Sequence, residues 1–138
     1  MRFSHGVPLA PLAVIGAAAD KKGTQVRFLP SKETFKITTF DRATIEHRLR
    51  ELAFLNSGVH IVLRDERPGS EYEVSLHYEG GLLEFVKYLD KAKNVLHPQP
   101  VTLKTTVDNI TVEFALEWTD SYHETMLCFT NNIPQRDG

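Results

Sequence analysis

A single hydroxyl group in an otherwise apolar strand pattern is the first feature of this sequence that could do chemistry. Within residues 23–30, Thr24, Val26 and Phe28 would share one side of an extended segment, because successive strand residues point to opposite faces. Gly23 precedes them and permits a close approach to the backbone. Such a face is either packed core or the wall of a small-molecule pocket in which Thr24 orients the ligand. The pattern alone favours core, because most apolar faces are simply packed.

Two further kinds of reactive side chain have plainer interpretations. His60 and His77 could face each other across a hairpin, but two histidines without a third ligand are weak evidence for a metal site. The single Cys128 lies in an apolar run, where a small buried hydrophobe is favoured over a nucleophile. We therefore predict no metal site and no catalytic residue in this chain.

Three lysines near the end of a predicted helix could face a phosphate group. Lys87, Lys91 and Lys93 lie on or just past its outer side, where they would more simply complement the helix C-terminus. The sequence contains no glycine-rich phosphate loop and no nucleophile with an adjacent base. A self-contained active site is therefore not expected.

Two amphipathic helices should position these residues. Asp41 is a good N-cap for a helix over residues 41–57, with apolar residues at helical spacing, and Gly58 should end it. The basic residues of this helix, His47, Arg48 and Arg50, are interpreted as a solvated face. The second helix is predicted over residues 82–91.

The remaining elements are predicted as strands. Residues 59–64 and 72–78 alternate around a Pro-Gly turn and predict a hairpin. An extended lead-in is expected to hold a strand at residues 12–15 before the strand at residues 23–30. The last part should be an antiparallel meander covered on one face by the second helix. Its three strands are predicted at residues 101–105, 111–118 and 125–130. The fold class is thus α+β, with mixed or antiparallel sheet segments.

Composition excludes several classes of protein. The 138 residues carry a formal net charge of −2, so no general basic field would attract nucleic acid. No apolar run approaches the ~20 residues needed to span a bilayer, and no signal peptide is evident. The lone cysteine favours a reducing compartment, so a cytoplasmic protein without membrane contact is expected. The half-apolar start resembles a cut piece of a longer chain. Self-association could occur through its exposed apolar residues Leu9, Leu12, Val14 and Ile15.

Six stretches of the sequence are distinctive in combination. They are HGVP (residues 5–8), APL (10–12), KGTQVRF (22–28), RLRELAFLNSGV (48–59), HYEGG (77–81) and CFTNNIPQRDG (128–138). Together they resemble the DNA gyrase B family, type II topoisomerases with a GHKL-type ATPase domain, and the resemblance covers all 138 residues in order.

The resemblance implies a division of the chain and a role for its first strand. Residues 1–79 would be the C-terminal part of the ATPase domain and residues 80–138 the first part of the transducer domain. The two glycines Gly80 and Gly81, which by themselves predict a hinge and a boundary within the chain, lie where these parts would meet. In the family, a Gly-Thr-x-Val strand lines the adenine pocket, where aminocoumarin inhibitors compete. Gly23 would be the close-approach position, Thr24 the hydrogen-bonding group and Val26 an apolar wall.

The resemblance also implies what the chain lacks. The family's catalytic glutamate, magnesium-holding asparagine and phosphate-contacting lysine have no counterpart here. ATP and Mg²⁺ would therefore serve the parent protein, and neither should bind tightly to this chain alone. The implied partners of the parent are the gyrase A subunit, in an A2B2 assembly, and double-stranded DNA.

Two functions remain open at this stage. The chain is either the part of a supercoiling enzyme that supplies one wall of an ATP site, or a structural coupling module with no nucleotide binding of its own. A standalone DNA-binding domain fits poorly with the net charge of −2.

Overall fold

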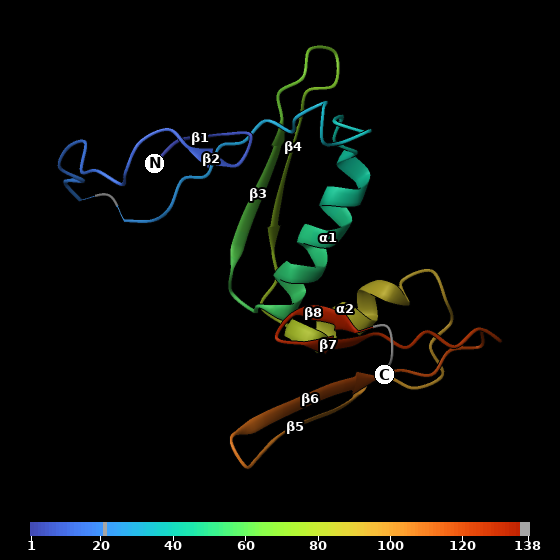
Figure 1. The fold of residues 1–138 in the computed structure, drawn as a ribbon. Helices are drawn as coiled ribbons and strands as arrows, with labels where there is room; N and C mark the ends of the chain where they lie inside the picture. Colours follow the sequence, from blue (N-terminus) through green and yellow to red (C-terminus); the bar gives the residue numbers. More distant parts are fainter. Residues whose placement is uncertain (21, 136–138) are drawn as a thin grey trace. The chain divides into compact units, whose positions relative to one another are not determined.

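The computed structural model describes residues 1–20 and 22–135, which form two compact units (Figure 1). The first unit contains residues 1–40 and the second begins at Asp41. The predicted α+β class is confirmed: the described residues form two helices and short antiparallel sheets. Neither helix among the described residues is long and apolar enough to cross a membrane.

The first unit contains one very short antiparallel ladder. Strands β1 (Phe3–Ser4) and β2 (Val7–Pro8) pair around a turn, and no other strand forms among the described residues of this unit. The predicted strands at residues 12–15 and 23–30 are therefore wrong. An extended segment needs a neighbouring strand to accept its backbone hydrogen bonds, and among the described residues of this unit β1 and β2 pair only with each other. The apolar side chains of residues 12–15 accordingly stay in solvent, and Ile15 is fully exposed.

Helix α1 (Arg42–Leu55) begins the second unit and confirms the prediction closely. The carboxylate of Asp41 accepts hydrogen bonds from the Thr44 backbone N–H, at 2.7 Å, and from its hydroxyl, at 2.6 Å. This contact satisfies one of the free N–H groups of the first turn. At the other end, Asn56 donates its backbone N–H to the Leu52 carbonyl at 3.0 Å.

The hairpin of β3 (His60–Asp65) and β4 (Tyr72–His77) lies along α1 (Figure 1). Its register pairs His60 with His77 and Asp65 with Tyr72. The alternating pattern turns the apolar side chains toward the helix, and Leu76 is buried. Phe54 of α1 is 1% exposed and stacks on the ring of Tyr78, with 3.7 Å between ring centroids. The small core of the chain therefore lies between α1 and this hairpin.

Helix α2 (Gly81–Leu89) follows at once and joins the same core. Its Phe85 is buried and stacks on Phe54, with ring centroids 5.0 Å apart. The first turn of α2 is closed by Glu84, whose carboxylate accepts the Gly80 backbone N–H at 3.0 Å. A side chain at Gly80 would place its Cβ 2.8 Å from the Cβ of Glu84, so this close approach requires glycine.

The last part of the chain forms two separate hairpins. Strands β5 (Val101–Val107) and β6 (Ile110–Leu116) pair with each other, and β7 (Cys128–Thr130) pairs with β8 (Ile133–Gln135). The predicted meander is therefore wrong, although its strands at 101–105 and 111–118 exist. The third strand is shortened to three residues because it turns back on β8 instead of joining β6. Helix α2 contacts β6, yet every residue of β5 remains exposed.

Candidate functional site

The predicted adenine-facing residues lie in the first unit, in a segment without regular structure. Gly23 has a φ of +133°, a conformation that L side chains rarely adopt, and open space surrounds the position of a Cβ there. Thr24 is exposed, and Val26 is 79% exposed. Phe28, two residues after Val26, meets Phe40 edge to face, with ring centroids 5.8 Å apart.

These three residues alone do not enclose a nucleotide. A small-molecule site buries most of its ligand, whereas Thr24 and Val26 both open to solvent. Nor does any group of three or more His, Cys, Asp or Glu residues in the described ranges form a metal-binding cluster. The Thr24 hydroxyl has one donor and two acceptor lone pairs, which is the hydrogen-bonding capacity that reading a base edge would require.

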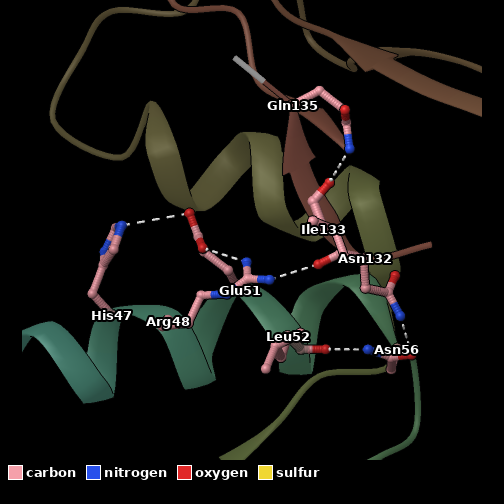
Figure 2. A network of polar contacts seen from close by, with 8 residues as sticks. All are labelled: His47, Arg48, Glu51, Leu52, Asn56, Asn132, Ile133 and Gln135. Carbon is pink, nitrogen blue, oxygen red and sulfur yellow. Dashed lines mark hydrogen bonds and ion pairs between the residues drawn. The ribbon is translucent and has the colours of Figure 1, made fainter. Parts of the chain in front are cut away.

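The densest polar arrangement in the second unit lies where α1 meets the β7–β8 hairpin (Figure 2). Arg48 donates one guanidinium N–H to the Glu51 carboxylate at 2.8 Å and another to the backbone carbonyl of Asn132 at 2.6 Å. His47 lies 3.5 Å from the other Glu51 oxygen. Because Glu51 is only 14% exposed, it holds Arg48 in a partly desolvated position. Arg48 thus connects α1 to a residue 84 positions later in the chain.

The side chain of Asn132 completes this connection. Its amide donates to the Asn56 side-chain oxygen at 2.8 Å, and the Asn56 amide donates to the Leu52 carbonyl at 2.7 Å (Figure 2). Asn56 therefore ends α1 and holds the hairpin turn with one side chain. Nearby, the Gln135 amide donates to the Ile133 carbonyl at 3.2 Å.

Arg50, on the same helix, has a separate environment. It pairs with Glu46 one turn earlier, and its guanidinium lies 5.4 Å from the centre of the Tyr88 ring. Burial disfavours its charge, but Tyr78, Tyr88 and Glu46 outweigh that cost and raise the pKa of Arg50. The interpretation of the basic residues as a solvated face is therefore wrong for Arg48 and Arg50, whose charges are engaged within the chain.

The two histidines do face each other, as predicted. The rings of His60 and His77 lie edge to face with centroids 5.7 Å apart. His60 Nε2 is within 2.5 Å of the Ser75 hydroxyl, and His77 Nε2 is 3.4 Å from a Glu79 oxygen. Each ring thus has a partner within the chain.

The three lysines in and just after α2 also have partners within the chain. Lys93 binds Asp90 at 2.7 Å, Lys87 donates to the Gln99 side chain at 3.3 Å, and Lys91 lies 4.6 Å from the centre of the Tyr88 ring. An open groove of about 1080 Å³ lies between α2, β6 and residues 118–129, and Lys93 and Asp90 contribute to its lining. Its walls mix polar and apolar side chains.

Sequence reasoning missed the contact between α1 and the β7–β8 turn. Asn131 and Asn132 are a turn signal, and both adopt positive φ angles, 49° and 64°. That signal locates a turn but says nothing of its partner, since no pattern in a single sequence links Asn132 to Arg48.

The family model and two curated relatives that match this chain all carry the name DNA gyrase B. Residues 81–138 match the family model of DNA gyrase B. The DNA gyrase B protein of Rickettsia conorii is 55% identical over 139 residues, covering 100% of this chain and 17% of that protein. The DNA gyrase B protein of Myxococcus xanthus is 39% identical over 136 residues, covering 99% of this chain and 16% of that protein. The chain thus spans about a sixth of the length of these curated relatives.

Two solved structures share the fold. A crystal structure of the DNA gyrase B protein from Myxococcus xanthus has a TM-score of 0.72 at 29% identity, covering 83% of this chain and 35% of that one. The 43K ATPase domain of Thermus thermophilus gyrase B, in complex with an aminocoumarin, has a TM-score of 0.66 at 31% identity. The match covers 78% of this chain and 29% of the Thermus thermophilus chain.

Proposed function

Because the chain belongs to the DNA gyrase B family, we propose that the full-length protein containing it couples ATP hydrolysis to negative supercoiling of double-stranded DNA. The observation that carries this proposal is the 55% identity to a DNA gyrase B protein over the whole chain. The likeness to a gyrase B ATPase domain supports the use of ATP. Such a protein would be an ATP-dependent type II topoisomerase.

Within that protein, the chain would contribute to two domains. Residues 1–79 would be the C-terminal part of the ATPase domain and residues 80–138 the first part of the transducer. The family match to residues 81–138 begins beside this proposed boundary, which supports the division. The compact units, by contrast, divide at residue 40, because α1, the β3–β4 hairpin and α2 share one core.

Gly23, Thr24 and Val26 would form one wall of the adenine pocket. The Thr24 hydroxyl would hydrogen-bond the base edge, Val26 would cover its apolar face, and Gly23 would allow the backbone to come close. Their exposure supports this role only in a longer protein, where other segments cover them. ATP and Mg²⁺ would serve the parent protein, and the isolated chain would bind neither tightly.

The partners of the parent would be a gyrase A subunit, in an A2B2 assembly, and double-stranded DNA in the cytoplasm. Aminocoumarin inhibitors would compete with ATP at the site. A second candidate function is a coupling module with no nucleotide binding of its own. The open surroundings of Thr24, together with the contacts that link α1 to the β7–β8 hairpin, favour it for the isolated chain.

The test uses the full-length protein reconstituted with gyrase A. ATP-dependent supercoiling of relaxed plasmid is expected, and its absence in the unaltered protein would refute the proposed function. Thr24→Ala should weaken nucleotide affinity by roughly 2–10-fold, the usual value of one hydrogen bond. Thr39→Ala, the same change at another exposed position of that unit, is the control. Unaltered affinity for ATP and aminocoumarin in Thr24→Ala would refute the pocket role alone.

A further inference from the structure

The contact between α1 and the β7–β8 turn crosses the proposed domain boundary at Gly80. We propose that Arg48, Asn56 and Asn132 form a latch that fixes the orientation of the β7–β8 hairpin against α1. In this role Arg48 is a positioning residue. That Arg48 passes a nucleotide-driven movement to the transducer rests on the proposed function. The existence of the latch does not rest on it.

The geometry of the turn suits this role. With φ angles of 49° and 64°, Asn131 and Asn132 reverse the chain tightly. Asn132 then presents its carbonyl to Arg48 and its side-chain amide to Asn56 (Figure 2). Two bonds from one residue, one to Arg48 within α1 and one to Asn56 at its C-terminal cap, restrict the rotation of the hairpin as well as its distance from the helix. A single hydrogen bond would leave the hairpin free to rotate about that bond.

The Arg48 side chain is also held in place by a residue of its own helix. Glu51 accepts a hydrogen bond from one guanidinium nitrogen, which leaves the other directed at Asn132. A planar guanidinium can serve two acceptors at once in a fixed geometry, whereas a lysine ammonium is a single point charge. The arrangement therefore requires arginine, and Lys at this position should restore the latch only in part.

The hairpin needs such an attachment, because its strands are only three residues long. An isolated two-stranded hairpin is marginal in water even when it is longer. Apart from the latch, its aromatic attachment is Phe129, whose ring centroid lies 6.4 Å from that of Phe85 in α2. Latch and ring contact thus reach the hairpin from two helices, one on each side of Gly80.

The backbone at Gly80 is also constrained. The Ser57 hydroxyl donates to the Glu79 carbonyl at 2.5 Å, and the Gly58 N–H donates to the Tyr78 carbonyl at 3.0 Å. These bonds tie the end of α1 to the residues immediately before the predicted hinge. A movement of α1 would consequently be carried toward β7–β8 rather than absorbed at Gly80.

Hydrogen exchange followed by mass spectrometry tests the latch in the full-length protein without nucleotide. In Arg48→Met, exchange in peptides covering residues 126–135 should accelerate roughly ten-fold, while peptides covering residues 42–55 keep their rate. Asn132→Gly keeps the backbone carbonyl and accepts the positive φ, so it removes only the bond to Asn56. It should give the same local pattern with a roughly 2–5-fold change. Arg64→Gln is the matched control, because it removes an arginine paired within the β3–β4 hairpin.

Two results would overturn the latch. One is unchanged exchange over residues 126–135 in both variants. The other is equal acceleration over residues 42–55, which would mean that Arg48 merely supports folding. If the unaltered protein supercoils DNA, Arg48→Met should also lower supercoiling per ATP hydrolysed several-fold, while Arg64→Gln should not. An unaltered protein without supercoiling would refute the proposed function and leave the exchange result to decide the latch.

Discussion

The β3–β4 and β5–β6 hairpins have similar strand lengths and similar alternation, but different surroundings. Helix α1 covers one face of β3–β4, and Leu76 there is 1% exposed. In β5–β6, by contrast, Leu103 is 49% exposed and the whole of β5 faces solvent. The comparison shows that alternation determines the strand conformation, whereas stability depends on the element that covers the apolar face.

The largest expected effect concerns the ring that covers the first hairpin. Phe54→Ala should lower the free energy of unfolding by about 3–5 kcal/mol, because it empties a site shared by α1, Tyr78 and Phe85. Phe114→Ala on β6, where the ring is 42% exposed, should cost about 1 kcal/mol or less. Urea denaturation of both variants measures the difference. Equal losses would mean that the exposed hairpin is covered in solution.

A matched pair of leucines compares the hairpins directly. Leu76→Ala should cost about 2–5 kcal/mol, since the side chain is fully buried. Leu103→Ala should cost under about 1 kcal/mol for the opposite reason. The measurement is again the unfolding midpoint in urea. A large loss for Leu103→Ala in a longer protein, but not in this chain, would identify β5 as a strand that other parts of the protein cover.

Helix α1 and the β3–β4 hairpin are the elements that the sequence predicted best. Helix α1 was predictable because Asp41 and the apolar spacing agree, although Asn56 caps it two residues before Gly58, where its end was predicted. The β3–β4 register followed from alternation and the Pro-Gly turn. Both depend on contacts within about 40 residues. The strand at residues 23–30 failed because a strand also needs a partner, and this unit provides none among its described residues.

The candidate sites were predictable to a different degree. Gly23, Thr24 and Val26 came from a family resemblance, and their role in nucleotide binding stays a prediction. The bond between Arg48 and Asn132 could not have been predicted, because neither residue has a local pattern that specifies its partner. Likewise, the predicted meander joined three strands that the structure divides between two hairpins.

A smaller effect should come from the turn of the exposed hairpin. Asp108 and Asn109 both have positive φ, at 49° and 62°. Asn109→Gly should stabilise β5–β6 by a few tenths to about 1 kcal/mol, because glycine adopts this conformation without steric cost. Slower amide exchange over residues 101–116 would show it. No gain would mean that the turn does not limit the stability of this hairpin.

The smallest effect is a pH dependence in the packed hairpin. Arg67 donates to Asp65 at 2.8 Å, and this bonding lowers the pKa of Asp65 from 3.8 to about 2. The stabilisation is therefore fully present above pH ~4 and is lost as the pH falls toward 2. NMR titration of the carboxyl group should show the low midpoint. In Asp65→Asn the corresponding step in stability between pH 4 and pH 2 should disappear, and a step that persists would assign it to another carboxylate.

The close contact between Gly80 and Glu84 has a consequence for mutational tolerance. Gly80 is exposed, so accessibility alone would class it among the freely variable positions. A Cβ there would nevertheless lie 2.8 Å from the first side-chain carbon of Glu84, which cannot swing away as the end of a long side chain can. In a saturation library selected for folded protein, this surface position should be depleted of nearly every substitution, in the manner of a core residue.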